Sequence, residues 1–192
     1  MELALPQPSP RTVVLVEGLS DRLALEALAA RHGRDLEAEA VSIVPMGGAQ
    51  AIGRFVDRFG PSGLDVRLAG LCDAGEERDF TRALERAGLG ADLSRADLER
   101  LGFFVCVADL EDELIRALGT DAVEAVVDAH GDLGPFRTLQ KQPAWLGRPA
   151  DEQLRRFMGS GGRRKTRYAR FLVGALDLAR VPRPLDRLLA HI

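Results

Sequence analysis

The chain has no long hydrophobic run. None of its apolar stretches approaches the roughly 18 consecutive residues needed to span a bilayer. The start of the sequence, MELALPQPSP, lacks the basic and apolar segments of a secretion signal. We therefore expect a cytoplasmic protein without a membrane partner.

Cysteine and histidine are scarce. The two cysteines, Cys72 and Cys106, do not stand in a paired zinc-binding spacing. Each falls near the end of an apolar run that predicts a buried strand, where a free cysteine behaves as a small hydrophobic side chain. None of the three histidines has an acid or thiol partner at a recognisable motif spacing. These absences argue against a zinc centre and against histidine catalysis.

Charge is unevenly distributed along the chain. From residue 141 to the end there are 12 basic and 4 acidic residues, a net charge of +8, so the overall charge of −3 leaves −11 on the first 140 residues. An acidic pocket beside a basic surface suits a phosphodiester, which needs basic side chains along its backbone. The alternative is a solvated arginine-rich helix. Only two of the 26 basic residues, Lys141 and Lys165, are lysines.

Apolar runs alternate with helical patterns over the first two thirds of the chain. Runs at residues 12–16, 41–45, 66–72 and 103–107 predict strands, and helical patterns lie between them at 20–31, 49–59 and 76–87. This alternation predicts an α/β fold, a parallel sheet of about four strands flanked by helices. Helices are expected to continue to the C-terminus as an extension, with a connecting loop at 131–149. In that loop, Trp145 and Phe136 are expected to pin the loop to the core more than to stack on bases.

Five carboxylates follow the predicted strands. Glu17 and Asp21 come after the first strand, Asp73 after the third, and Asp109 and Glu111 after the fourth. Ligands of open parallel sheets bind beyond the carboxyl ends of the strands, so these acids can converge. Oxygen ligands without clustered His or Cys favour Mg²⁺ or Mn²⁺ over zinc. The alternatives are local: Asp21 as a helix cap, and the segment DLEDEL as an acidic helix N-terminus.

Four segments resemble a known family. VEGLSD, the pair Gly47 and Gly48, CDAGEE and DLEDEL occur in the order of a Toprim domain, and the form of DLEDEL with the tail segments KTRYARFL and VPRPL is most similar to the overcoming-lysogenization-defect (OLD) nucleases. The resemblance implies a flexible N-terminus at 1–11, a Toprim catalytic domain at 12–130 and a helical extension at 131–192 packed on it. It also implies that the five acids bind metal.

The resemblance assigns further roles and has one departure. Lys165 matches the lysine that such nucleases carry in their helical part, where it would act on the charge of the reacting phosphate; its alternative is an ordinary phosphate-binding or exposed lysine. Toprim domains usually have Asp-x-Asp where this chain has Asp73, Ala74 and Gly75. Glu76, Glu77 or a water would then have to replace the second aspartate.

The expected activity is that of a divalent-metal-dependent phosphodiesterase, a DNA endonuclease or nickase acting in phage defence or DNA repair. Glu17 and Lys165 would carry catalysis, and Arg163, Arg164, Arg167 and Arg170 would line the nucleic-acid backbone. The chain has no G-x-x-x-x-G-K-[ST] pattern, so any ATPase would be a separate chain. A homodimer would suit a small domain that grips a duplex. The alternative is a noncatalytic nucleic-acid-binding Toprim scaffold. A topoisomerase mechanism would rest on Tyr168, which lies inside the arginine-rich helix.

Overall fold

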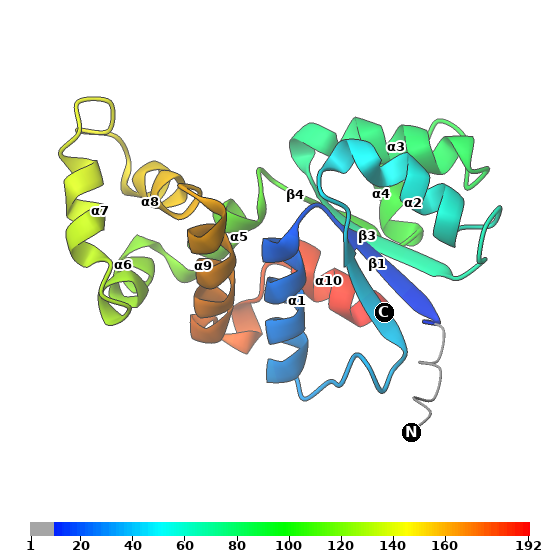
Figure 1. Ribbon diagram of the computed structural model, residues 1–192, viewed down its shortest axis with the longest axis horizontal. Coiled ribbons are helices and arrows are strands. Elements are labelled where there is room, and N and C mark those ends of the chain that lie inside the picture. The colour runs from blue at the N-terminus through cyan, green and yellow to red at the C-terminus, as the bar shows by residue number, and fades with distance from the viewer. Residues whose placement is uncertain (1–9) are drawn as a thin grey trace, which may run out of the picture.

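The computed structural model describes residues 10–192, so nearly all of the expected flexible N-terminus lies outside the described residues. Four parallel strands form one sheet in the order β2-β1-β3-β4 (Figure 1). The strands are β1 Thr12–Val16, β2 Val41–Pro45, β3 Arg67–Asp73 and β4 Phe103–Cys106. This confirms the predicted α/β class and the parallel sheet.

Helices cover both faces of the sheet, because alternate residues of a strand point to opposite faces. Val14 and Val16 of β1 join the core beneath α1 Leu19–Arg31, α5 Leu110–Leu118 and α10 Arg183–His191. Val13 and Leu15 join a second core beneath α2 Ile52–Phe59, α3 Glu77–Arg86 and α4 Arg95–Arg100. Both cysteines are buried in these cores, as expected.

The central strands lie so close that one position requires glycine. A Cβ atom at Gly70 would lie 2.8 Å from the carbonyl oxygen of Leu15 on β1 and 2.7 Å from the ring of Phe103 on β4. The backbone of β3 is thereby pressed between its two neighbours.

A helical lobe extends from one end of the sheet (Figure 1). It comprises α6 Thr120–Ala129, α7 Leu133–Gln140, α8 Ala150–Met158 and α9 Gly162–Ala175. Helix α7 corrects the loop predicted for 131–149. Gly134 and Pro135 suggested a loop, but Pro135 stands in the first turn of α7, where no backbone N–H donor is needed. Phe136 is fully buried and packs edge-on against Phe157, with ring centroids 5.3 Å apart.

The lobe is fastened to the sheet half by α9, which packs along α1. The guanidinium of Arg31 on α1 donates hydrogen bonds to the carbonyls of Val173 and Leu176, each 2.7 Å long, at the end of α9. After a 3₁₀ turn at Leu178–Arg180, helix α10 returns to β3 and β4. No helix among residues 10–192 is long and apolar enough to cross a membrane.

Candidate metal centre and adjoining hollow

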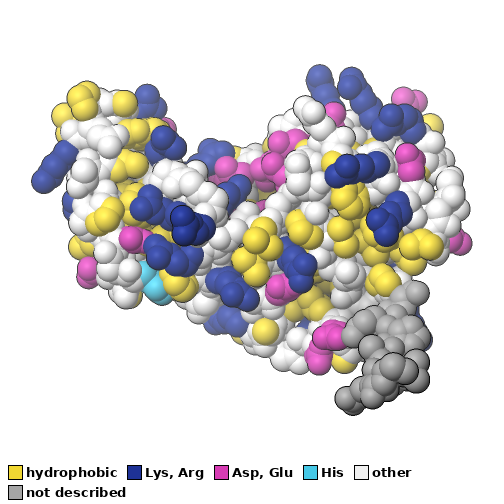
Figure 2. Space-filling view, in the orientation of Figure 1, with side chains coloured by type: hydrophobic (Ala, Val, Ile, Leu, Met, Phe, Trp, Pro, Cys, Tyr) yellow, Lys and Arg dark blue, Asp and Glu magenta, His cyan; other side chains and the backbone are white. Residues whose placement is uncertain are grey.

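Three carboxylates meet at the carboxyl edge of the sheet. Glu17 follows β1, Asp73 ends β3, and Glu76 closes the 3₁₀ turn Ala74–Glu76 (η2) that follows β3. One oxygen of each lies within 4.8 Å of the other two. Figure 2 shows acidic side chains gathered in the notch between the sheet half and the helical lobe.

The three other predicted acids do not belong to this group. Asp21, in the first turn of α1, is 8% exposed and accepts a 2.8 Å hydrogen bond from the backbone N–H of Gly18. Asp109 caps α5 by accepting the N–H of Asp112 at 2.8 Å, and Glu111, in the first turn of the same helix, is 5% exposed. Both side chains therefore have local capping roles, and the charges of both also raise the pKa of Asp73.

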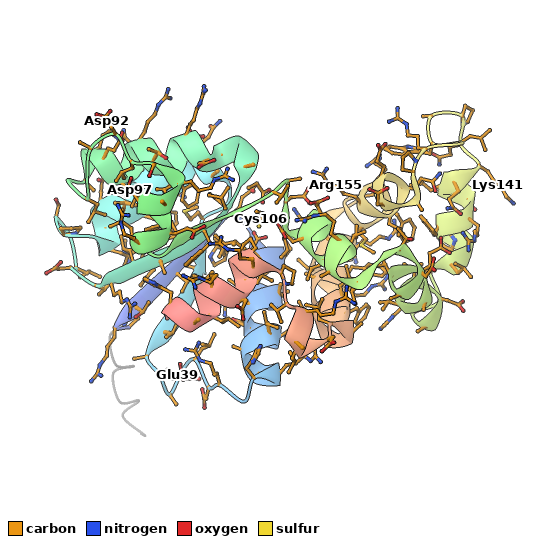
Figure 3. All side chains as sticks on the ribbon, turned by 180° about the vertical axis from the view of Figure 1, so that it is seen from behind. Glu39, Asp92, Asp97, Cys106, Lys141 and Arg155 are labelled. Atoms are coloured by element: carbon orange, nitrogen blue, oxygen red, sulfur yellow. The ribbon has the colours of Figure 1, made fainter. Side chains whose placement is uncertain are left out.

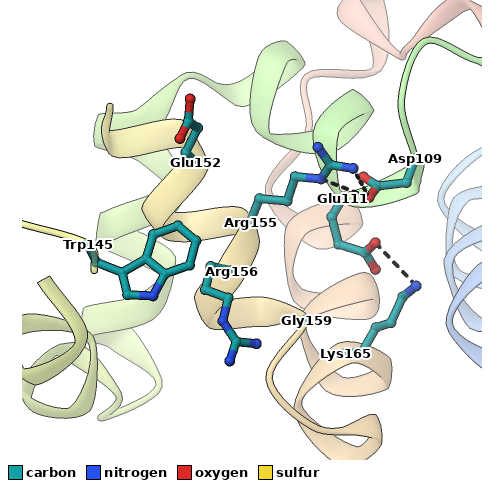
Figure 4. A pocket seen from close by; sticks show the side chains of 8 residues that line it. All are labelled: Asp109, Glu111, Trp145, Glu152, Arg155, Arg156, Gly159 and Lys165. Atoms are coloured by element: carbon teal, nitrogen blue, oxygen red, sulfur yellow. Dashed lines mark hydrogen bonds and ion pairs between the residues drawn. The ribbon is translucent and has the colours of Figure 1, made fainter. Parts of the chain in front are cut away.

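Two basic side chains of the lobe, Arg155 and Lys165, contact these acids (Figure 4). The Nε of Arg155 on α8 donates to Asp109 Oδ2 at 2.8 Å. Lys165 Nζ on α9 lies 3.4 Å from Glu111 Oε2. Figure 3 shows Arg155 reaching the junction near Cys106 at the end of β4, whereas Lys141 lies at the far end of the lobe. Of the chain's two lysines, Lys165 is the one beside the acids.

The pKa values of four carboxyl groups are raised by burial and, to a smaller degree, by neighbouring negative charges. Burial, together with the charges of Asp21 and Glu17 and, less strongly, Glu76 and Asp109, raises the pKa of Asp73 to about 8. Burial also raises the pKa of Glu111 to about 7, although Lys165 opposes this. The pKa values of Asp21 and Glu76 are raised chiefly by burial as well. The cluster therefore has an excess of negative charge that favours a proton or a cation.

Two carboxylate oxygens lack hydrogen-bond partners although they are buried. Glu76 Oε2 and Glu111 Oε1 have none among the residues that the structure describes. A buried carboxylate oxygen without a partner is costly, and a bound cation would satisfy it. The donors at the cluster are all carboxylate oxygens, which fit a hard divalent cation.

Glu76 and Glu77, the two candidate replacements for the missing second aspartate, lie in different surroundings. The 3₁₀ turn η2 directs Glu76 to Glu17 and Asp73. Glu77 instead begins α3 and accepts a 3.0 Å hydrogen bond from Arg95 Nε, an ion pair that lowers the pKa of Glu77. Glu77 thus lies outside the cluster, because the chain turns through about 100° between adjacent helical residues.

Lys165 remains charged in this environment. Burial alone would lower the pKa of its ammonium group, but Glu111, Asp21 and Asp73 outweigh that effect and raise it. Lys165 is therefore a fixed positive donor at the edge of the cluster.

The arginines of α9 do not act as one free row. Arg164 lies over the ring of Phe157, 4.2 Å from its centroid, and Arg167 pairs with Asp132. Arg163 and Arg170 are exposed. The predicted row of four is therefore reduced to two side chains without these internal contacts.

Tyr168 has a structural place. Its side chain is 1% exposed, and its hydroxyl donates a 2.9 Å hydrogen bond to Asp132 Oδ2. Burial and this hydrogen bond raise the pKa of Tyr168 far above its usual value. The environment is opposite to that of an activated tyrosine nucleophile.

Two hollows are lined in part by these acids, each by different ones. One, of about 780 Å³, includes Glu17, Glu76, Gly47 and Gly48. The two glycines have φ values of +77° and +121°, and their N–H groups donate to the carbonyl of Glu17 at 3.0 and 3.1 Å, so they form a tight turn that holds Glu17 in place. The other hollow, of about 540 Å³, is lined by Asp109, Glu111, Trp145, Glu152, Arg155, Arg156, Gly159 and Lys165.

The second hollow contains residues that the sequence did not mark. Arg155 and Arg156 belong to no recognisable motif, and Trp145 was expected to pin a loop. They share a position on α8 or on the loop before it, and the docking of the lobe places all three around one hollow.

Comparison with known proteins agrees with this architecture. Residues 11–74 match the family described as overcoming lysogenization defect protein-like, TOPRIM domain. The C-terminal region of the Burkholderia pseudomallei OLD protein superposes with a TM-score of 0.73 at 20% identity, over 95% of this chain and 96% of that chain. The C-terminal region of the Xanthomonas campestris pv. campestris OLD protein gives a TM-score of 0.73 at 24% identity, over 95% and 92%. No curated protein matches by sequence.

Proposed function

Because residues 11–74 match the OLD-like Toprim family, we propose that this protein is a nuclease that hydrolyses phosphodiester bonds with the help of Mg²⁺ or Mn²⁺. The observation that carries the proposal is the convergence of Glu17, Asp73 and Glu76 within 4.8 Å of one another. Toprim domains generally bind divalent metals, and the partnerless oxygens of Glu76 and Glu111 fit such an ion.

In this proposal the acidic residues bind the metal and the basic residues contact the phosphates. Glu17, Asp73 and Glu76 would hold one ion, and Asp21, Asp109 and Glu111 would complete the site or hold a second. Bound divalent ions supply an activated water and stabilise the leaving oxygen. The charged ammonium group of Lys165 would donate hydrogen bonds to phosphate oxygens without releasing a proton. Its positive charge would stabilise the negative charge that develops on these oxygens. Arg163 and Arg170 would contact the backbone without reading sequence.

The wider setting is part of the same proposal. We expect the substrate to be DNA, cleaved or nicked by a cytoplasmic enzyme in phage defence or DNA repair, with an ATPase on a separate chain and a homodimer as the form that grips a duplex. One observation favours a second candidate, a noncatalytic nucleic-acid-binding scaffold: Gly75 stands where Toprim domains usually carry the second aspartate.

Supercoiled plasmid separates the two functions. The wild-type protein with Mg²⁺ or Mn²⁺ should nick or linearise the plasmid, and Glu17→Gln should reduce the rate by at least about a hundredfold, in the range seen when charge stabilisation is lost at an active site. Glu37→Gln, an exposed glutamate outside the cluster, serves as the matched control and should cleave normally.

Binding of the same plasmid is measured in parallel by gel shift. No cleavage with either metal, combined with equal binding by the wild type and Glu17→Gln, would support the scaffold and contradict the nuclease. Cleavage that persists in Glu17→Gln would show that the acidic cluster is not the active site.

A further inference from the structure

The hollow of about 540 Å³ has two chemically different parts, and the proposed cleavage accounts for only one of them. At one end, Asp109 and Glu111 meet Arg155 and Lys165. Trp145 and Arg156 line the hollow away from these ion pairs (Figure 4). Its volume lies within the range of about 300–1,000 Å³ typical of pockets for small organic groups. The acids and their ion pairs line only one part of this volume, so the rest is open to a ligand.

Trp145 is held in place by its backbone. Its carbonyl accepts a 2.8 Å hydrogen bond from the side-chain amide of Gln153. Gln153 is 6% exposed, and its own oxygen accepts from Gln140 on α7 at 2.7 Å. This buried amide connects α7, α8 and the loop between them. The guanidinium of Arg148, which does not line the hollow, lies 5.2 Å from the centroid of the Trp145 ring. The indole is therefore presented to the hollow by a preorganised support and not by a mobile loop.

Arg156 differs from the neighbouring Arg155. Arg155 is neutralised by Asp109, whereas Arg156 forms no ion pair within residues 10–192 and is exposed to solvent. A cation without a carboxylate partner beside a half-exposed indole forms a pair of groups that matches a nucleotide: an aromatic face for the base and a positive charge for a phosphate.

We propose that this hollow binds one unpaired nucleotide of the nucleic-acid strand, next to the bond to be cut. The base stacks on Trp145, and Arg156 contacts a phosphate. This inference rests on the proposed function, because the acid end of the hollow must face the reacting phosphate. A base inside a duplex is covered on both faces by its neighbours, so the indole can stack only on a base that has left the helix or lies in a single strand.

The protein carries its own probe for this contact. Trp145 is the only tryptophan in the chain, so stacking of a base on it should quench nearly all of the indole emission. The wild-type protein in EDTA, which prevents cleavage, is titrated with a single-stranded DNA 10-mer, an RNA 10-mer of the same sequence, and the blunt DNA duplex. Quenching by a single strand with little quenching by the duplex is expected.

Affinity is measured separately by anisotropy of a labelled 10-mer. Trp145→Ala should weaken binding about 5- to 150-fold, the range that loss of one base stack gives. Arg156→Gln should weaken binding. It should also reduce the slope of log K against log salt concentration by about the amount that one phosphate contact contributes. Two matched controls should bind like the wild type: Leu146→Ala, an exposed neighbour in the loop, and Arg187→Gln, an exposed arginine on α10. Melting curves of each variant show that it is folded.

Each outcome decides the inference. Wild-type affinity in folded Trp145→Ala would overturn it, as would anisotropy binding without quenching. If the plasmid is cleaved while the emission stays unquenched, the nuclease stands and the nucleotide pocket fails. If neither binding nor cleavage occurs, both proposals fail. Quenching by RNA but not by DNA would support the nucleotide pocket and show that its ligand is RNA.

Discussion

Neutralising Asp73 should make the metal-free protein more stable. In the fold, the pKa of this carboxyl rises from 3.8 to about 8, chiefly through burial and the charges of Asp21 and Glu17. At about 1.4 kcal/mol per pKa unit the shift corresponds to about 6 kcal/mol. Water reaches part of the side chain and screens the repulsion, so we expect about 2 kcal/mol for the Asp73→Asn protein. For a chain of this length that is roughly 4–8 °C in Tm.

The effect has a defined pH window. Below about pH 4 the carboxyl is protonated in both the folded and the unfolded protein, so it costs nothing. Between about pH 4 and 8 the unfolded chain ionises while the fold still binds the proton, so the stability of the wild type falls as pH rises. Above about pH 8 the full penalty is present. The Tm difference between Asp73→Asn and the wild type should therefore open between pH 4 and 8.

Thermal melts followed by circular dichroism in EDTA at several pH values measure this difference, with exposed Asp57→Asn on α2 as the matched control. Saturating Mg²⁺ should reverse the order, since an ion at about 100 times its Kd adds about 2.7 kcal/mol to the wild type. The reasoning is refuted if Asp73→Asn is less stable than the wild type at pH 8 in EDTA, or if the difference does not vary with pH.

Two further predictions test the fold around the site. Gly70→Ala places a methyl group against the Leu15 carbonyl and the Phe103 ring, so it should cost about 1–3 kcal/mol and lower the urea midpoint; an unchanged midpoint would show that β3 can move. Tyr168→Phe removes only the hydrogen bond to Asp132, so stability should fall by about 1 kcal/mol while plasmid cleavage keeps its wild-type rate; loss of cleavage with an intact fold would give the hydroxyl a chemical role.

The sheet was predictable from sequence because its strands are continuous apolar runs. The predicted strands at 12–16 and 41–45 agree with β1 and β2, and the others differ by one residue at their ends. The spatial order β2-β1-β3-β4 was not predictable, since strand pairing depends on which faces pack and not on local pattern. Helix α7 was missed because Gly134 and Pro135 are typical of loops, and their place in a first helical turn depends on where the helix begins.

The site was predictable only at the level of strand ends. Acids after β1, β3 and β4 are expected to reach one edge of a parallel sheet. The structure groups Glu17 and Asp73 with Glu76, whereas Asp21, Asp109 and Glu111 do not belong to that group. The choice between Glu76 and Glu77 depends on a single 3₁₀ turn, which the sequence CDAGEE does not determine. The contacts from α8, by contrast, depend on the docking of the lobe, which is a long-range property.

Helix α9 works as a rigid spacer of fixed length. Arg31 fastens its end at Val173, and Lys165 lies eight residues earlier, about 12 Å along the axis. One residue inserted between these two points would swing the ammonium group about 100° around the helix and away from Glu111. Related chains that keep this contact can therefore vary in length before α9, in the Gly-Ser-Gly segment 159–161, or after it, but not between Lys165 and Val173.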